Sequence, residues 1–530
     1  MLNDSRPLGD DGSSPAHGDV VDCGLRTGRW VLAAAILGSG ITFIDGTVVN
    51  VALPVLQSEL DATVAGAQWI VESYALMLAA LILVGGSLGD RLGRRKVFSL
   101  GVFIFGLASI WCGLAPNLTN LIFARAVQGL GAALLVPGSL ALISANFARS
   151  RRGRAIGTWS GVTAISAGVG PVLGGWLVAN LSWRWIFFIN IPLAAAAILI
   201  CWFRVPESRD EDVKGRIDWF GAASATIALG GIVFGLIESN AGGFYSARVL
   251  WSFVIGIVAG VAFVFAELRN ENPMMPFGLF RSKIFAGANL LTLFLYAALG
   301  GILFFLPFNL IQVQGYAPAA AGAALLPFVV TMFTLSRWAG GLVDRYGSKL
   351  PLVVGPTLAA CGFAMFIIPG VEVGSYWTSF FPAIAVMSIG MSIAVAPLTT
   401  TVMSAVDERH AGVASGINNA VSRTASLVAV AVFGVVMLGT FGNSLNDQLT
   451  AESISADVRS EILIQTGDLV NLKIPESVSD EQKDIIKTYV RNSFVAGFRN
   501  VALLAAMLGV LSAIAALALI DGKPAGTVAN

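Results

Sequence analysis

The chain alternates long apolar runs with short polar loops. An α-helix needs roughly 20 apolar residues to cross a lipid bilayer, and fourteen runs approach or exceed that length. The pattern therefore predicts an all-α integral membrane protein with fourteen transmembrane helices. The predicted spans are 29–54, 67–88, 96–115, 119–145, 155–179, 185–203, 217–238, 247–267, 285–311, 319–340, 350–370, 377–403, 411–439 and 494–520.

Composition supports a membrane protein and excludes several other classes. Of the 530 residues, 56% are hydrophobic and 12% are charged, whereas soluble proteins carry about 25% charged residues. The net charge of +1 gives no field that would favour nucleic acid. The four cysteines and two histidines have no metal-ligand spacing, and no phosphate-binding loop occurs. We therefore expect no metal, no cofactor and no enzymatic activity.

The distribution of basic residues predicts the orientation. Lysine and arginine are concentrated in the loops that follow even-numbered spans, and cytoplasmic loops carry such an excess. Both termini are then expected in the cytoplasm. The protein itself is expected in the cell (inner) membrane. The basic residues that carry this argument are Arg91, Arg94, Arg95, Lys96, Arg149, Arg151, Arg152, Arg154, Arg204, Arg209, Lys214, Arg216, Arg281, Lys283, Arg345, Lys349 and Arg409.

A short basic loop occurs twice, each time between two apolar runs. The first copy spans 86–98 and the weaker second copy spans 340–350. Basic segments also enter the fifth and thirteenth spans, at 152–157 and 409–416, so spans 9–14 are predicted to repeat spans 1–6. We expect the loops to act as conformational latches, with Asp90 pairing with an arginine or a helix N-terminus of the other bundle. Their candidate residues are Gly86, Asp90, Arg91, Gly93, Arg94, Arg95, Asp344 and Arg345.

The repeat divides the chain into two six-helix bundles and an inserted helix pair. The N-terminal bundle is predicted over 28–204, the pair over 205–270 and the C-terminal bundle over 271–520. Residues 1–27 and 521–530 are expected to form cytoplasmic tails, the first of them disordered. The polar loop 440–493 would lie outside, either as a helical hairpin or as a loosely ordered loop.

Three charged residues interrupt apolar spans at similar depth. Asp45 lies in the first span, Glu72 in the second and Arg125 in the fourth. Ionisable residues inside a membrane are costly and usually functional. Two carboxylates and one arginine form a candidate proton-coupling cluster, and the alternative is a static ion pair that locks the helices together.

Two further groups of residues are candidates for conformational change and substrate binding. The fifth span contains Gly161, Gly170, Pro171, Gly174 and Gly175, whose small side chains allow close helix approach and whose proline bends the helix. Aromatic residues in other spans could line an apolar cavity, although packing is their commoner role. The tentative cavity residues are Phe43, Tyr74, Tyr296, Phe305 and Arg423.

Together these motifs resemble the fourteen-span drug:proton antiporters (EmrB/QacA type) of the major facilitator superfamily. The resemblance rests on the 86–98 loop, on Asp45–Pro54, on Arg125–Gly131, on Trp183–Pro192 and on the glycine-proline motif of the fifth span. It implies two bundles that exchange access to a central cavity, and export of lipophilic compounds against entering protons. It also implies a coupling role for Asp45, proton handling by Arg125 and control of leakage by the fifth span.

The sequence also departs from the best-known exporters of this type. Those similar proteins carry acids in spans ten and thirteen, where this chain has none in mid-span ten and has Arg423 in span thirteen. We therefore expect monovalent lipophilic cations, neutral or zwitterionic compounds to be preferred over dications, with room for anions. Alternatives are an exporter of one endogenous lipid or metabolite and a transport-inactive membrane sensor or assembly protein. A periplasmic adaptor is a candidate partner.

Overall fold

The computed structural model describes residues 25–147, 149–209, 218–270, 273–372, 374–406, 411–452 and 454–521. Within these residues every regular element is a helix. Thirteen of the described helices are long and apolar enough to cross a membrane, and Lys349–Met365 is a shorter apolar helix. The all-α membrane fold is thus confirmed, and the fourteen apolar helices agree with the fourteen predicted spans.

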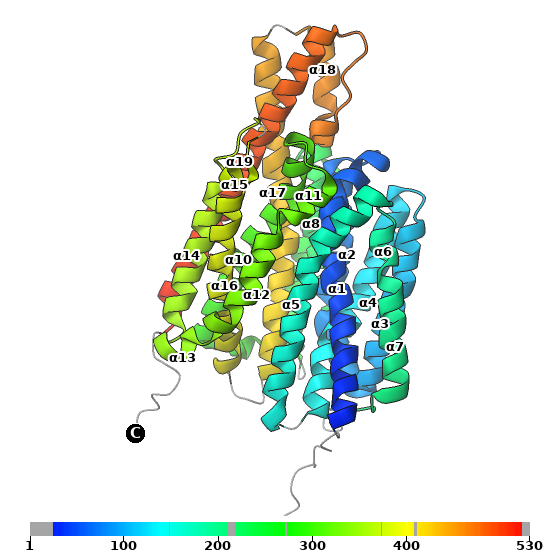
Figure 1. Ribbon diagram of the computed structural model, residues 1–530, viewed down its shortest axis with the longest axis vertical. Helices are drawn as coiled ribbons and strands as arrows, with labels where there is room; N and C mark the ends of the chain where they lie inside the picture. The colour runs from blue at the N-terminus through cyan, green and yellow to red at the C-terminus, as the bar shows by residue number, and fades with distance from the viewer. Residues whose placement is uncertain are drawn as a thin grey trace, which may run out of the picture.

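The first half of the chain forms one bundle (Figure 1). Predicted span six is broken at Ile189 into a short helix and a longer one. The helices of this bundle are α1 (Leu25–Glu59), α2 (Val64–Leu92), α3 (Arg94–Leu114), α4 (Leu118–Asn146), α5 (Arg149–Asn180), α6 (Trp185–Phe188) and α7 (Asn190–Arg204).

The second bundle has more broken helices. A π-helix, Asn309–Val313, follows α10 directly, and predicted span ten is split into α11 and α12. The helices of this half are α10 (Lys283–Phe308), α11 (Pro318–Ala323), α12 (Leu326–Gly340), α13 (Leu342–Tyr346), α14 (Lys349–Met365), α15 (Tyr376–Ser379), α16 (Phe381–Ser404), α17 (Ala411–Ala451), α18 (Ala456–Ile464) and α19 (Asp480–Leu519).

The two halves repeat one packing arrangement. In the first half α1 packs against α5 and α7, and in the second half α10 packs against α17 and α19. The repeated loops also turn alike, since Gly93 has φ +112° and Gly347 has φ +73°. Residues with a Cβ rarely adopt such positive φ values, which explains the glycine at this place in both copies.

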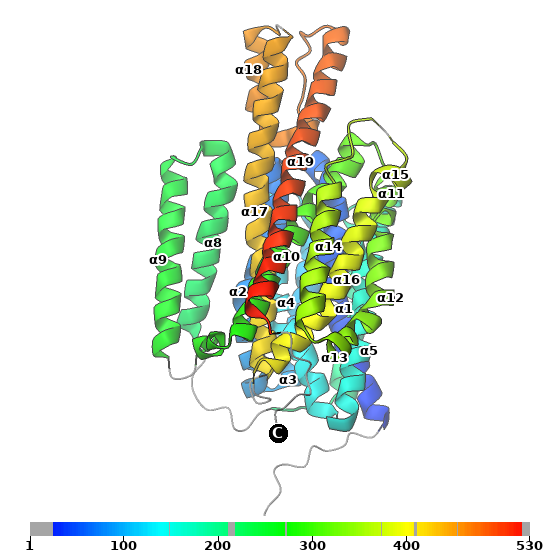
Figure 2. The same cartoon turned by 90° about the vertical axis from the view of Figure 1, so that its left-hand side faces the viewer.

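The inserted pair, α8 (Trp219–Gly242) and α9 (Ala247–Arg269), lies at the side of the two bundles (Figure 2). Helix α8 packs against α2 of the first half and α17 of the second, whereas α9 packs chiefly against α8. A 3-10 helix, Phe277–Arg281, precedes α10. The pair therefore covers one side of the contact between the halves.

Helices α17 and α19 are twice as long as a membrane span. They contain 41 and 40 residues, or about 60 Å at 1.5 Å per residue, against about 30 Å of hydrocarbon. Their surplus turns project from the bundle and carry α18 and the 3-10 helix η4 (Thr466–Asn471) between them (Figures 1 and 2). Of the two alternatives for residues 440–493, the structure has the helical hairpin. We call this side the hairpin end, and the opposite side, where α1 begins and α19 ends, the termini end.

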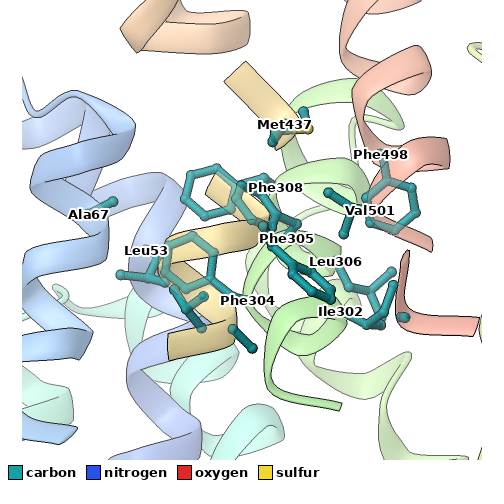
Figure 3. Close-up of a cluster of buried hydrophobic side chains, with 14 of the residues drawn as sticks. Leu53, Ala67, Ile302, Phe304, Phe305, Leu306, Phe308, Met437, Phe498 and Val501 are labelled. Carbon is teal, nitrogen blue, oxygen red and sulfur yellow. The ribbon is translucent and has the colours of Figure 1, made fainter. Parts of the chain in front are cut away.

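The two halves are joined tightly at the hairpin end. Gln57 of α1 receives a hydrogen bond from the side chain of Gln312 (3.0 Å) and donates one to the Asp468 carbonyl (3.2 Å). Below this polar layer, Leu53 of the first half lies in one apolar cluster with Phe304 and Phe308 of the second (Figure 3). This end of the interface between the bundles is therefore closed.

The closure can be tested by cross-linking Gln57 to Asn471, whose side-chain amides lie 3.4 Å apart. We expect Gln57→Cys with Asn471→Cys, in a chain with Cys23 and Cys361 changed to serine, to be joined by a short bis-methanethiosulfonate reagent, which forms a disulfide with each thiol and releases sulfinate. Protease cleavage between the halves and gel mobility would measure the yield. Gln57→Cys with Asp480→Cys, which places the second thiol at the start of α19, should not cross-link. Equal yields from both pairs would contradict a closed hairpin end.

Candidate functional site

A buried ion pair lies inside the first bundle. The guanidinium of Arg125 on α4 donates from Nη1 to Oδ2 of Asp45 on α1 over 2.5 Å. The side chains of Arg125 and Asp45 are 1% and 0% exposed. The sequence predicted these two residues as partners, and the structure brings them together.

The second carboxylate oxygen of Asp45 is held by two amides. The side chain of Gln128 donates to Oδ1 over 2.8 Å, and that of Asn190, at the start of α7, donates over 3.1 Å. Both amides also lie within hydrogen-bond distance of the Ser109 hydroxyl on α3. With Arg125, three N–H donors therefore surround one carboxylate.

Arg125 has other partners besides Asp45. Its Nε donates to the backbone carbonyl of Ile70 on α2 (3.0 Å), and its Nη1 also reaches Oε1 of Gln128 (2.7 Å). The guanidinium lies 4.4 Å from the centroid of the Tyr74 ring, within the range of a cation–π contact. Arg125 therefore keeps neutral partners even when the charge on Asp45 is removed.

Small residues allow α4 to present this arginine. A Cβ on Gly129 would clash with the carbonyl of Tyr74 on α2, and a Cβ on Gly131 would lie 2.6 Å from the amide of Phe105 on α3. Helix α4 consequently fits closely between α2 and α3. Because Arg125 and Gln128 are three residues apart, they share one face of α4 and point toward Asp45 together.

Glu72 does not join this cluster, and its predicted place beside Asp45 and Arg125 is wrong. Successive residues turn by about 100° around a helix, so Glu72 points roughly opposite to Ile70 and Tyr74, which face Arg125. One turn away, Gln68 donates to the Val430 carbonyl of α17. Glu72 thus faces the seam between α2, α8 and α17, fully buried, and neither carboxylate oxygen has a hydrogen-bond partner.

The glycines of α5 lie against both halves. A Cβ on Gly170 would overlap Thr47, and one on Gly174 would overlap Val48, both on α1. A Cβ on Gly175 would overlap the Pro318 carbonyl of α11. The adjacent Pro171 carbonyl is similarly close to Gly322, while Gly161 has open space around it. The close approach of α5 to α1 and α11 therefore explains why glycine is needed at three of the four predicted positions.

Four of the five predicted cavity residues come together. The guanidinium of Arg423 on α17 lies 5.9 Å from the centroid of the Phe43 ring on α1, and Arg423 is close enough to Tyr74 and Tyr296 to interact with them electrostatically. Phe305 is elsewhere. It is fully buried between Phe304 and Phe308 in the apolar cluster of the hairpin end (Figure 3), so its assignment to the cavity is wrong.

The signature loop of the first half has partners in its own two helices and in the segment that follows α7. Asp90 pairs with Arg94 over 2.8 Å, and Arg95 lies 3.6 Å from Glu207. The pairing of Asp90 thus differs from the contact with the other bundle that we expected. Gly93 packs beside the Glu207 carboxylate, Gly86 faces Pro137, and Arg345 lies over the ring of Tyr346. Arg91 also makes polar contacts, and the side chain of Asp344 is outside the described residues.

Three residues of the site were not predicted from the sequence. Gln128 and Asn190 occur inside the quoted motifs without an assigned role, and Ser109 carried no signal at all. Amides in otherwise apolar spans were the available sign for the first two, because buried polar groups require hydrogen-bond partners.

Two repeated bundles of membrane helices, one of them with a buried charged site, are typical of the class of secondary transporters. The chain belongs to the Major Facilitator Superfamily, whose model matches residues 35–430. The similarity drawn from the sequence motifs is thereby confirmed.

Relatives and solved structures agree with this assignment. The chain is 34% identical to multidrug resistance protein Stp of Mycobacterium tuberculosis, over 83% of this chain and 82% of that protein. It is 30% identical to the tetracenomycin C resistance and export protein of Streptomyces glaucescens, over 96% and 94%. Its fold matches that of a bacterial homolog of the human lysosomal transporter Spinster, crystallised inward-facing and unoccupied, with a TM-score of 0.66, 16% identity and coverage of 94% and 99%.

The ion pair generates a prediction about stability. Arg125→Lys keeps the charge but cannot reach Asp45, Gln128 and the Ile70 carbonyl together, because an ammonium lacks the planar fork of a guanidinium. We expect a loss of about 2–4 kcal/mol in the free energy of unfolding, near the range for disrupted buried pairs. Thermal unfolding in detergent would show it as a lowered midpoint.

Arg94→Lys is the matched control, because the same chemical change falls on a partly exposed pair within one loop. Exposed pairs of this spacing contribute about 0.3–0.5 kcal/mol. If the unfolding midpoint of Arg125→Lys is no lower than that of Arg94→Lys, the buried site does not require the geometry of the Arg125 guanidinium.

Proposed function

We propose that this protein is a proton-driven exporter of lipophilic small molecules in the cell membrane. The observation that carries the proposal is the fully buried pair of Asp45 and Arg125, in which a titratable carboxylate is held by a network confined to one bundle. The printed functions of the relatives, multidrug resistance and export of tetracenomycin C, support the choice of substrate.

Protonation of Asp45 is the step that would weaken this network. Adding a proton removes the charge that binds Nη1 of Arg125, while the Ile70 carbonyl, Gln128 and the Tyr74 ring still hold the guanidinium. The link between α1 and α4 weakens without leaving a buried charge wholly unpaired. Such a partial release costs less than full separation of the pair.

A chain of close contacts leads from Asp45 to the second bundle. Thr47 and Val48, on the next turn of α1, contact Gly170 and Gly174 of α5. One residue further, Gly175 of α5 contacts Pro318 and Ala319 of α11. Movement of α1 after protonation would therefore displace α5 against the other half, which is where the bundles must separate.

The basic loops support an orientation with the termini end in the cytoplasm. The closed hairpin end then faces outward, so this state is inward-facing. With Asp45 charged and paired, it corresponds to the stage after a proton has left and before substrate binds. The pairing of Asp90 with Arg94 fits this stage, because a latch on the cytoplasmic side would be released when that side is open.

Asp45→Asn tests the proposal. The neutral isostere keeps the size of the side chain but cannot take up or release a proton. We therefore expect proton-driven ethidium efflux, measured as uptake into the lumen of inverted vesicles, to fall at least tenfold. Asp484→Asn, an exposed residue of α19, is the control and should transport normally. Efflux by Asp45→Asn close to that of the control, at equal amounts of inserted protein, would remove Asp45 from coupling.

Glu72 is a second candidate for proton binding, independent of the first site. A fully buried carboxyl without a hydrogen-bond partner is costly when charged, and it lies where α8 and α17 meet α2. We expect Glu72→Gln to alter the pH dependence of efflux while the maximal rate stays within about threefold of the unmodified protein, because a titratable group is removed without a broken ion pair. Efflux would be followed from pH 5.5 to 8.5, and an unchanged profile would assign Glu72 a structural role.

A further inference from the structure

Arg423 lies about twelve residues into α17, roughly 18 Å along its axis, and faces the first bundle. Its guanidinium lies over Phe43 of α1, and Arg423 is close enough to Tyr74 of α2 and Tyr296 of α10 to interact with them electrostatically. Residues from both bundles therefore lie near one cation. Arg423 itself is only partly buried.

Among the described residues, no carboxylate pairs with Arg423. Asp45 is occupied by Arg125 and two amides, and Glu72 points into the seam beside α8 without a partner. The charges of Asp45 and Arg125 cancel, which leaves Arg423 as the surplus positive charge beside the aromatic rings. An unpaired cation in a membrane interior is unfavourable, and a bound anion would relieve that cost.

The surrounding side chains favour a particular kind of anion. Phe43 and Tyr296 are partly exposed and offer apolar ring surface, which suits an aromatic body, whereas the ring of Tyr74 is buried against Arg125. A guanidinium offers a planar pair of N–H donors that matches a carboxylate. A cationic compound would meet the repulsion of Arg423 at the same rings, so the aromatic side chains alone do not select for cations here.

We propose that Arg423, together with Phe43 and Tyr296, binds aromatic compounds that carry one carboxylate. The inference rests on the proposed export function and names a substrate class for it. It also shifts the expectation drawn from the sequence, in which cations and neutral compounds came first and anions were only accommodated.

Three naphthalene derivatives test the charge preference on one ring system: 2-naphthoate, 2-naphthylmethanol and 2-naphthylmethylamine. The full chain in lipid nanodiscs would be titrated with each by calorimetry at pH 7.5. We expect 2-naphthoate to bind most tightly and Arg423→Gln to weaken its binding by about tenfold to a hundredfold. Binding of the alcohol should change less than about threefold, and binding of the amine should be unchanged or stronger.

Two variants make the result specific. Arg423→Lys keeps the charge without the planar fork and should retain part of the preference for 2-naphthoate. Arg248→Gln, which changes an exposed arginine at the start of α9, should bind all three compounds as the unmodified protein does. Equal affinities of the unmodified protein for acid and alcohol, or equal weakening of both by Arg423→Gln, would overturn the inference.

Transport separates this inference from the proposed function. Proteoliposomes with a pH gradient would be loaded with the same three compounds. If the gradient drives none of them while the Arg423-dependent preference in binding holds, the export function fails and the binding site stands. If all three are driven and Arg423→Gln lowers them equally, the export function stands and the anion site fails.

Discussion

A carboxylate and a guanidinium that are buried together place demands on every helix around them. Each N–H and each oxygen must find a partner, because an unsatisfied polar group in a dry interior costs several times what a hydrogen bond contributes. Asp45 and Arg125 meet this demand with Gln128, Asn190 and the Ile70 carbonyl, which lie on α4, α7 and α2. The positions of these helices relative to α1 are therefore fixed by one charged pair.

The same constraint explains the close packing around α1. A guanidinium reaches Asp45 only if α4 approaches α2 and α3 closely, and Gly129 and Gly131 remove the side chains that would prevent it. Opposite α4, Gly170 and Gly174 bring α5 against the turn of α1 that follows Asp45. Because α5 also touches α11, a change of charge at one residue can reach the contact between the bundles without passing through a flexible loop.

The sequence predicted the helices and the pairing of Asp45 with Arg125, because apolar length and isolated charges are local signals. The turn glycines 93 and 347 followed from the repeat. Glu72 was misplaced because depth in the membrane was considered without helical phase, and its phase depends on how α2 rotates against α8 and α17. Phe305 was misplaced for a related reason, since an aromatic residue in an apolar helix has no local mark that separates core from cavity. The partner of Asp90 depends on the conformational state, which a sequence does not specify.

The two halves share a packing plan but divide the chemistry between them. In the first half, α1 and α4 carry opposite charges that satisfy each other. In the second, α10, the counterpart of α1, is joined to α17, the counterpart of α5, by neutral groups, with Asn418 donating to Thr292 over 2.7 Å and to Asn289 over 3.2 Å. Arg423 lies one turn further along α17 and has no such partner. The first bundle, whose buried charges compensate each other, can respond to a proton. Arg423, an uncompensated charge at the interface between the bundles, can respond to a solute. Alternating access requires that both responses act on that interface.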